Sequence, residues 1–234
     1  MGQEESEEGL YVYPDLRTCI AGKFQSCKLE LGEAAMIVSA KLSAGIMELS
    51  SGRAEGPQLS YELSTRDMIC RHMHLRDPYE KSMVEVKVSG AEGGGEGVFA
   101  CKDIPATTVV AFYNGIRIPA DEEDTNDTWE DCSYRIFSAV DEDIDSDNTE
   151  RIDMPAHLRS TEEYCATVGH KINHSFTPNC KFSKFVHPLY GPIPCVVTTE
   201  DVIAGQELFT YYKYLLSDCP DWYSNLWEMQ GIVS

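Results

Sequence analysis

The sequence lacks the features that mark membrane-spanning and secreted proteins. No apolar run approaches the roughly 18 residues that span a bilayer, and the most apolar segment, residues 33–49, is interrupted by Lys41. The Met-Gly-Gln-Glu-Glu start is acidic, whereas a secretory signal begins with basic residues. These absences favour an intracellular protein.

Paired cysteines are also missing. The nine cysteines are scattered and odd in number, without any CxxC pair. The histidines at 72 and 74 have no second pair at the spacing of a zinc site. We therefore expect reduced thiols, several of them buried as small hydrophobic residues, and no bound metal ion.

Positive charge is scarce. The chain has 19 Lys and Arg residues against 39 Asp and Glu residues, which gives a formal net charge of −20. This charge repels nucleic acid phosphates and anionic membranes, so neither is an expected partner. It favours a basic protein partner, although solubility alone is the other explanation. The densest acidic stretches, residues 121–131 and 141–150, are expected to be solvated loops.

What the sequence does contain is a series of short strand patterns separated by turns. After an acidic start at residues 1–9, which we expect to be disordered, the pattern predicts an antiparallel sheet over residues 10–63 with a turn at Pro14-Asp15. The Asn114-Gly115 pair is the strongest hairpin signal in the chain. Further strands are predicted in the segments 83–90, 98–104, 107–119, 132–140, 151–154, 181–188 and 193–214.

Two segments predict helices. Residues 160–169 have Ser160 as a candidate N-cap, Glu163 three positions on, and Gly169 as the terminator. Asp221 is a candidate N-cap for a second helix near the C-terminus. The chain is therefore expected to be mostly β.

Three stretches of unusual composition are candidates for a functional site, and the first is the glycine-rich EGGGEG at residues 92–97. It lacks the Gly-Lys-Ser/Thr of a phosphate loop, and a strand pattern follows it where a dinucleotide-binding fingerprint needs a helix. Its glycines either let the backbone approach a ligand closely or form a flexible hairpin turn.

The second stretch, residues 211–214, holds three tyrosines, of which Tyr212 and Tyr214 would share one face of a strand. Core packing is the ordinary role of such aromatics. Rings and hydroxyls that converge on a slot also hold cationic amines. Aromatic residues that other strand patterns could bring to the same slot are Tyr113, Tyr134 and Phe182.

The third stretch, GHKINHSFTPNC at residues 169–180, holds two histidines, two asparagines, a lysine and a cysteine. Polar side chains crowd in this way when they bond one another, the backbone or a ligand. Cys165 and His174 raise the alternative of nucleophilic catalysis. No nucleophile elbow or oxyanion loop surrounds them, so this alternative is disfavoured.

Taken in order, GEGVF, FYNG, GHKINHSFTPNC and ELFTYYKY resemble the SET-domain protein lysine methyltransferases. The resemblance covers nearly the whole chain, because YVYPD and DPYE resemble the region ahead of the SET domain in a member with MORN repeats. It implies a MORN-like or pre-SET antiparallel β region over 10–81, a SET domain with a knot-like core over 82–214, and a C-terminal segment with a short helix over 215–234.

The resemblance also implies a site, with S-adenosylmethionine as the cofactor. Gly94 and Glu96 would contact its methionine part, and Trp222 would cover its adenine. An alternative role stays open for the His174 side chain: it could be a core histidine whose hydrogen bonds are all internal. The residues that match the family's cofactor pocket are Gly94, Glu96, His170, Asn173, His174 and Trp222. Those that match the lysine channel are Tyr113, Tyr134, Phe182, Tyr212 and Tyr214.

The implied activity is methyl transfer to a lysine ε-amine of a histone tail or another nuclear protein. We accordingly expect a monomer in the nucleus, or in nucleus and cytoplasm. Removing the proton of a lysine at pH 7 costs roughly 4–5 kcal/mol, and a desolvated channel beside a sulfonium cation lowers that cost. Two alternatives stay open: a non-catalytic SET module that binds basic peptides, and a membrane-associated MORN scaffold, against which the net charge argues.

Overall fold

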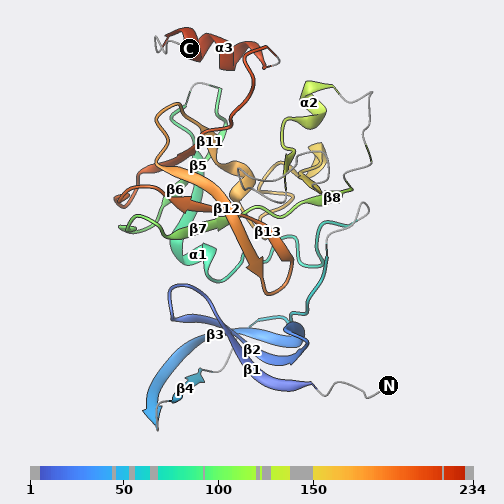
Figure 1. Cartoon of the computed structure of the whole chain (residues 1–234), viewed down its shortest axis with the longest axis vertical. Helices are drawn as coiled ribbons and strands as arrows, with labels where there is room; N and C mark the ends of the chain where they lie inside the picture. Colours follow the sequence, from blue (N-terminus) through green and yellow to red (C-terminus); the bar gives the residue numbers. More distant parts are fainter. Residues whose placement is uncertain are drawn as a thin grey trace.

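Figure 1 shows the computed structural model of the chain as an elongated molecule, with the N-terminal sheet at one end and helix α3 at the other. The structure describes residues 6–43, 46–52, 56–63, 68–91, 93–119, 122, 128–137, 150–217 and 219–229. Three further small sheets lie between the two ends. The prediction of a mostly β chain is confirmed.

A four-stranded antiparallel sheet forms the N-terminal end. Its strands pair in sequence order as β1 (Glu7–Val12), β2 (Thr18–Gln25), β3 (Lys28–Ser43) and β4 (Ile46–Ser51). Asp15 Oδ1 accepts the backbone N–H groups of Arg17 and Thr18 at 3.0 and 2.9 Å, which closes the predicted first turn. Because β1 begins at Glu7, residues 7–9 belong to the sheet and not to the acidic start, of which residues 1–5 lie outside the described part.

Buried polar and aromatic contacts join this sheet to the rest of the molecule. Tyr13 is fully buried, stacks on Tyr79 with ring centroids 5.4 Å apart, and donates its hydroxyl to Asp77 Oδ2 at 2.6 Å. His187 Nδ1 accepts the N–H of Leu189, so its Nε2 carries the proton and donates to the same Asp77 oxygen at 3.1 Å. Hydrogen bonds of this kind compensate for burying a carboxylate.

Three small sheets make up the body of the molecule, with strand orders β11-β14-β6-β5, β12-β13-β7 and β8-β10-β9. Within the described residues their pairings are antiparallel except for β11 with β14. That parallel ladder brings residues 173–174 beside 209–210, and the knot-like core stays a prediction. The strands are β5 (Val84–Val88), β6 (Glu96–Ala100), β7 (Val109–Phe112), β8 (Ile116–Ile118), β9 (Ile136–Phe137), β10 (Arg151–Asp153), β11 (Asn173–His174), β12 (Cys180–His187), β13 (Gly191–Thr198) and β14 (Glu207–Thr210).

Helices are few and short in the described residues. They are α1 (Glu80–Met83), α2 (Trp129–Cys132), the 3₁₀ turns η2 (Ala156–Leu158) and η3 (Gly169–Lys171), and α3 (Asp221–Met229). None of them is long and apolar enough to cross a bilayer. The predicted C-terminal helix is present, but Asp221 lies in its first turn and not ahead of it as a cap.

The hairpin predicted at Asn114-Gly115 is wrong. The strands on either side belong to different sheets, since β7 pairs with β13 and β8 pairs with β10. Asn114 is fully buried and donates from Nδ2 to the carbonyl of Ile69 at 3.3 Å. A Cβ on Gly115 would lie 2.5 Å from the carbonyl oxygen of Asp153, so the glycine permits a close backbone approach. Long-range pairing has overridden the local turn preference.

The helix predicted over residues 160–169 is also wrong. One turn forms, in which Tyr164 N donates to Ser160 O at 3.0 Å, and the chain is then irregular up to η3. Ser160 Oγ accepts the N–H of Glu162 and not that of Glu163, so the predicted capping box is absent. The next backbone donors are taken by distant partners: Ala166 N bonds to the carbonyl of Met73 at 3.0 Å. These tertiary hydrogen bonds replace the helical ones.

Other predictions fall on segments with few described residues. The acidic loops expected at 121–131 and 141–150 lie largely outside the described part, apart from residues 122, 128–131 and 150. Of the strand expected over 132–140, β9 covers Ile136–Phe137, and residues 138–140 are outside the described part. The nine cysteines are all free.

Candidate functional site

The glycine-rich turn joins β5 to β6 and lies against the loop that holds Asn173. Gly93 and Gly95 have φ values of +71° and +59°, which strain any residue with a Cβ. A Cβ on Gly94 would lie 2.7 Å from Ser89 Oγ and 3.0 Å from Asn173 Nδ2. The turn is therefore a close-packed part of the candidate site, and not only a flexible hairpin.

Glu96, at the start of β6, is held by two residues that come later in the chain, Lys171 of η3 and Thr161. Its Oε2 lies 2.7 Å from Lys171 Nζ, and its Oε1 accepts the hydroxyl of Thr161. Partial burial alone would raise the pKa of Glu96, but the hydrogen bonds from Lys171 and Thr161 outweigh it and hold that pKa below its ordinary value. Glu96 is thus a carboxylate, and its pairing with Lys171 fastens the glycine-rich turn to η3.

Asn173 belongs to a frame of polar side chains around β14. Its Nδ2 donates to the carbonyl of Glu96 at 3.0 Å and to Glu207 Oε1 at 3.3 Å. Glu207 Oε1 also accepts the hydroxyl of Ser89 at 2.5 Å. Asn179 adds a second clamp, because its Nδ2 donates to the carbonyl of Glu207 at 2.9 Å and its Oδ1 accepts the N–H of Phe209 at 2.8 Å. These bonds explain why residues 169–180 are so rich in short polar groups.

His170 is buried, and neither ring nitrogen makes a well-aligned hydrogen bond, although backbone groups of Arg159 and Thr167 lie near the ring. Burial, together with the charge of Lys171, lowers the pKa of His170 to about 3. The ring is therefore neutral, and it contacts the aromatic side chains of Tyr113, Tyr134 and Tyr164 at centroid distances of 6.3, 6.4 and 5.6 Å. His170 lines the aromatic part of the site as a neutral, unprotonated group.

His174 is satisfied on one side only. Its Nδ1 accepts the backbone N–H of Tyr212 at 3.2 Å, whereas Nε2 is buried without a partner. Burial lowers the pKa of His174 to about 4. Its ring packs between Phe176 and Tyr223, with centroids 4.4 and 4.7 Å away. Nδ1 therefore has the internal partner expected of a core histidine, whereas Nε2 carries the ring proton of the neutral form and can donate one hydrogen bond.

Four tyrosines from three separate segments converge on one place. Burial raises the pKa of Tyr113 well above its ordinary value, and the neighbouring groups of Tyr212, Asp153, Tyr134 and Tyr214 add to this. Burial likewise raises the pKa of Tyr212, and raises that of Tyr214 to about 12. These three phenols stay protonated at neutral pH.

The hydroxyl hydrogens of two of these tyrosines are committed to carbonyl oxygens. Tyr113 Oη donates to the carbonyl of Tyr134, and Tyr212 Oη donates to the carbonyl of Ile172, both at 2.6 Å. Each oxygen therefore offers only lone pairs to a neighbour, and a group with N–H donors is its complement. Protonated phenols and a histidine of low pKa are poorly suited to take a proton from an ammonium group.

Phe182 lies beside the four tyrosines and contributes a ring without a hydroxyl. It lies on β12, half-buried, with its ring at 6.1 Å from the ring of Tyr113. Tyr134 is covered by the guanidinium of Arg159, whose Cζ lies 4.5 Å from the ring centroid. The structure thus brings all five predicted channel residues into one cluster.

Trp222 approaches the site from α3. Its ring lies 6.0 Å from that of His174 and 6.4 Å from that of Tyr212, and 43% of the residue is exposed. The next residue, Tyr223, is fully buried and fastens the helix to the site through its ring contact with Phe176 at 5.0 Å. A half-open indole over the His174 side is placed to cover a planar ligand.

Several participants were not predicted from the sequence. Glu207 opens the ELFTYYKY stretch and Asn179 sits in GHKINHSFTPNC, so their neighbourhood was noted without their roles. Thr161 lies in the segment mistaken for a helix, which hid its bond to Glu96. Trp129, in α2, contacts Tyr214 at 4.8 Å, and only the fold could reveal this.

Comparison with known proteins is consistent with this geometry. The family model for the SET domain matches residues 95–213. Histone-lysine N-methyltransferase SETD7 of Halocynthia roretzi is 32% identical over 241 residues, which cover 99% of this chain. The chain spans 60% of the length of that relative.

Two solved structures are similar to part of this chain, each with a TM-score of 0.41. One is ctPRC2 in an autoinhibited conformation bound to S-adenosylmethionine, at 22% identity over 64% of this chain and 17% of that chain. The other is a humanized mutant of the Chaetomium thermophilum Polycomb Repressive Complex 2 bound to the inhibitor GSK126, at 21% identity over 56% of this chain and 15% of that chain.

Proposed function

Because the chain belongs to the SET-domain family, we propose that it is a protein-lysine N-methyltransferase that uses S-adenosylmethionine. The curated relative is named as a histone-lysine N-methyltransferase, so the proposed substrate is a lysine of a histone tail or another basic nuclear protein. The net charge of −20 suits such a partner. A nuclear location follows from the same substrate.

The residues of the site fit this cofactor. S-adenosylmethionine supplies an electrophilic methyl group on a sulfonium. The glycine-rich turn lets backbone groups approach a ligand closely, and the unpartnered Nε2 of His174 adds a buried polar atom that needs a partner. Trp222 offers a ring to a purine. We assign Gly94, Glu96, His170, Asn173, His174 and Trp222 to this pocket.

The phenol cluster fits a lysine side chain. The hydroxyl oxygens of Tyr113 and Tyr212 are free to accept N–H groups of the amine and to turn its lone pair toward the methyl donor. Burial keeps water away, which favours the neutral amine that attack requires. Because none of the described side chains in this cluster is suited to act as a base, the proton leaves to solvent. Tyr134, Tyr214 and Phe182 complete the wall.

The observation that best supports the proposal is that Tyr212 makes hydrogen bonds in two parts of the site. Its hydroxyl bonds the carbonyl of Ile172 and its N–H bonds the ring of His174, so one residue belongs to both the phenol cluster and the candidate cofactor loop. Transfer between two bound groups needs reacting atoms about 3 Å apart, and a shared residue holds the two halves at a constant separation.

The experiment is mass spectrometry of a lysine peptide library incubated with S-adenosylmethionine. We expect added mass of one or more methyl groups on lysines within basic sequences, and loss of transfer in Tyr212→Phe. The alternative, a SET module that only binds basic peptides, predicts binding without added mass. It also predicts no thermal stabilisation by S-adenosylmethionine, whereas a cofactor pocket raises the unfolding temperature with cofactor concentration.

A further inference from the structure

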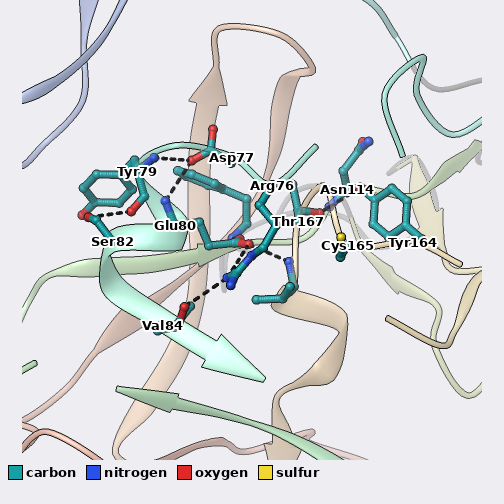
Figure 2. Close-up of polar contacts among 12 residues, drawn as sticks. Arg76, Asp77, Tyr79, Glu80, Ser82, Val84, Asn114, Tyr164, Cys165 and Thr167 are labelled. Atoms are coloured by element: carbon teal, nitrogen blue, oxygen red, sulfur yellow. Dashed lines mark hydrogen bonds and ion pairs between the residues drawn. The ribbon is translucent and has the colours of Figure 1, made fainter. Parts of the chain in front are cut away.

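Glu80 is a fully buried carboxylate that no motif of the site includes. It opens helix α1, and its two oxygens serve two different segments. Oε2 accepts the backbone N–H of Phe112 at 2.8 Å, and Oε1 accepts the backbone N–H of Val168 at 2.9 Å. The close-up in Figure 2 shows the polar groups around it, with Arg76 and Asp77 from the same stretch of chain.

Each of those two N–H groups directly precedes a part of the candidate site. Phe112 is followed by Tyr113 of the phenol cluster. Val168 is followed by Gly169 and His170, which lead to Asn173. The two segments also touch: a Cβ on Gly169 would lie 2.5 Å from the carbonyl oxygen of Phe112. One carboxylate therefore sits at the junction of the lysine channel and the cofactor loop.

We infer that Glu80 is a positioning residue for methyl transfer, which holds the backbone of Tyr113 and the backbone of the cofactor loop in fixed register through its two carboxylate oxygens. This inference rests on the proposed function. A carboxylate is the side chain that this geometry needs, because each of its oxygens accepts a hydrogen bond without offering a hydrogen in return. Loss of one oxygen as an acceptor would free one segment to shift relative to the other.

The ionisation state of Glu80 decides whether it keeps both hydrogen bonds, from Phe112 and from Val168. Burial, followed by the charge of Asp77, raises the pKa of Glu80 to about 8, although its two backbone donors and Arg76 oppose the rise. The titratable groups that face Glu80 are Arg76 and Asp77 on its own stretch, and Tyr164 and Cys165 on the segment that carries Val168. From β7 the contact is the Phe112 backbone N–H. Above this pKa both oxygens accept; below it, one of them carries a proton.

The test compares wild type with Glu80→Gln across pH 6.5 to 9.5. Glutamine keeps the shape but places an NH₂ group, which cannot accept a hydrogen bond, against one of the two N–H donors. Protonated Glu80 places there a hydroxyl, whose oxygen accepts a weaker hydrogen bond than a carboxylate oxygen does. We expect kcat to fall about tenfold at pH 9.5, with the peptide KM within threefold of wild type. The ratio of wild-type to Glu80→Gln kcat should approach one as the pH falls below 7. Ionisation of the substrate lysine is common to both proteins and cancels in the ratio.

The matched control is Tyr13→Phe, which removes a buried hydrogen bond to Asp77 and leaves both Glu80 bonds in place. It should lower the unfolding temperature without changing kcat. A kcat ratio for Glu80→Gln that stays constant with pH, or a kcat equal to wild type at pH 9.5, overturns the inference. A wild-type protein that binds peptide and transfers no methyl group overturns the proposed function itself.

A measurement on the wild-type protein covers the case in which Glu80→Gln does not fold. The amide proton shifts of Phe112 and Val168 should titrate together between pH 7 and 9, because both protons lie in hydrogen bonds to the titrating group. Shifts that stay flat over this range while kcat changes would also overturn the inference.

Discussion

At the scale of single residues, the proposed function makes Phe182 the residue expected to set how many methyl groups are added to a lysine. A hydroxyl at this position would give the amine, or a water molecule, one more hydrogen-bond partner, worth roughly 0.5–1.5 kcal/mol and so up to about tenfold in a relative rate. Phenylalanine lacks that partner and leaves slightly more room. We expect wild type to form dimethyl-lysine beside monomethyl-lysine, and Phe182→Tyr to suppress the second transfer.

The measurement is a time course of methyl states on one peptide by mass spectrometry, for wild type and Phe182→Tyr. Phe185→Tyr on the same strand is the control, since Phe185 packs against Phe112 and not against Tyr113. Wild type that stops at one methyl group after all unmodified peptide is consumed would contradict the argument.

Asn173 is expected to be needed for cofactor binding. Its amide ties β6, β14 and the glycine-rich turn together, so its removal leaves buried polar groups unpaired at roughly 1–3 kcal/mol each. Asn173→Ala should weaken S-adenosylmethionine binding at least tenfold by calorimetry while circular dichroism shows a retained fold. Asn225→Ala in α3 is the control, since that residue is exposed. Unchanged affinity in Asn173→Ala would refute the assignment.

The lowered pKa of His170 predicts that the stability of the fold depends on pH. Its folded pKa of about 3 lies below the ordinary value of 6.5, so the unfolded chain binds the extra proton first as the pH falls. The stability tied to a neutral His170 is present above about pH 6.5 and is lost toward pH 3, by up to about 1.4 kcal/mol per pH unit. Without cofactor, His170→Phe should gain in unfolding free energy relative to wild type as the pH falls from 7 to 5, in urea titrations. A constant difference would contradict it.

At the scale of elements, α3 is expected to act as a cover for the cofactor and not as a support for the fold. Its Tyr223 is buried against His174, whereas Trp222 beside it stays half open. Trp222→Ala should therefore weaken S-adenosylmethionine binding about tenfold by calorimetry, the loss of one stacked ring being worth roughly 1–3 kcal/mol. Its unfolding temperature without cofactor should stay close to wild type.

The control for the helix is Met229→Ala, at its exposed C-terminal end. Equal loss of affinity in both variants would mean that helix integrity matters, and not the indole. A large drop in stability for Trp222→Ala would show that the ring belongs to the core.

At the scale of the whole molecule, the net charge of −20 is expected to speed the encounter with basic peptides. Screening by salt shortens the range of this attraction to about 8 Å at physiological ionic strength, so steered association slows as salt rises. Stopped-flow association of a Lys/Arg-rich peptide should slow at least fivefold between 20 and 300 mM NaCl. A neutral peptide of equal length is the control. An association rate that does not change with salt would mean that the net charge serves solubility and does not attract peptides.

The sequence alone determined the class of the fold, the order of most strands and the stretches that the structure brings together in the candidate site. Strand alternation, the Pro14-Asp15 turn and the glycine-rich turn are local signals, because side-chain periodicity and backbone restriction act over a few residues. The polar crowding at residues 169–180 was visible for the same reason. The MORN-like character of residues 10–81 and the monomeric state stay predictions.

Tertiary structure alone decided the rest. Asn114-Gly115 looks like a hairpin turn, yet its flanking strands find partners far along the chain, and residues 160–169 lose their helix to backbone partners such as Met73. Glu80 is 32 residues from Phe112 and 88 from Val168. A buried donor must find an acceptor wherever the chain supplies one, and no local pattern records which distant residue that will be.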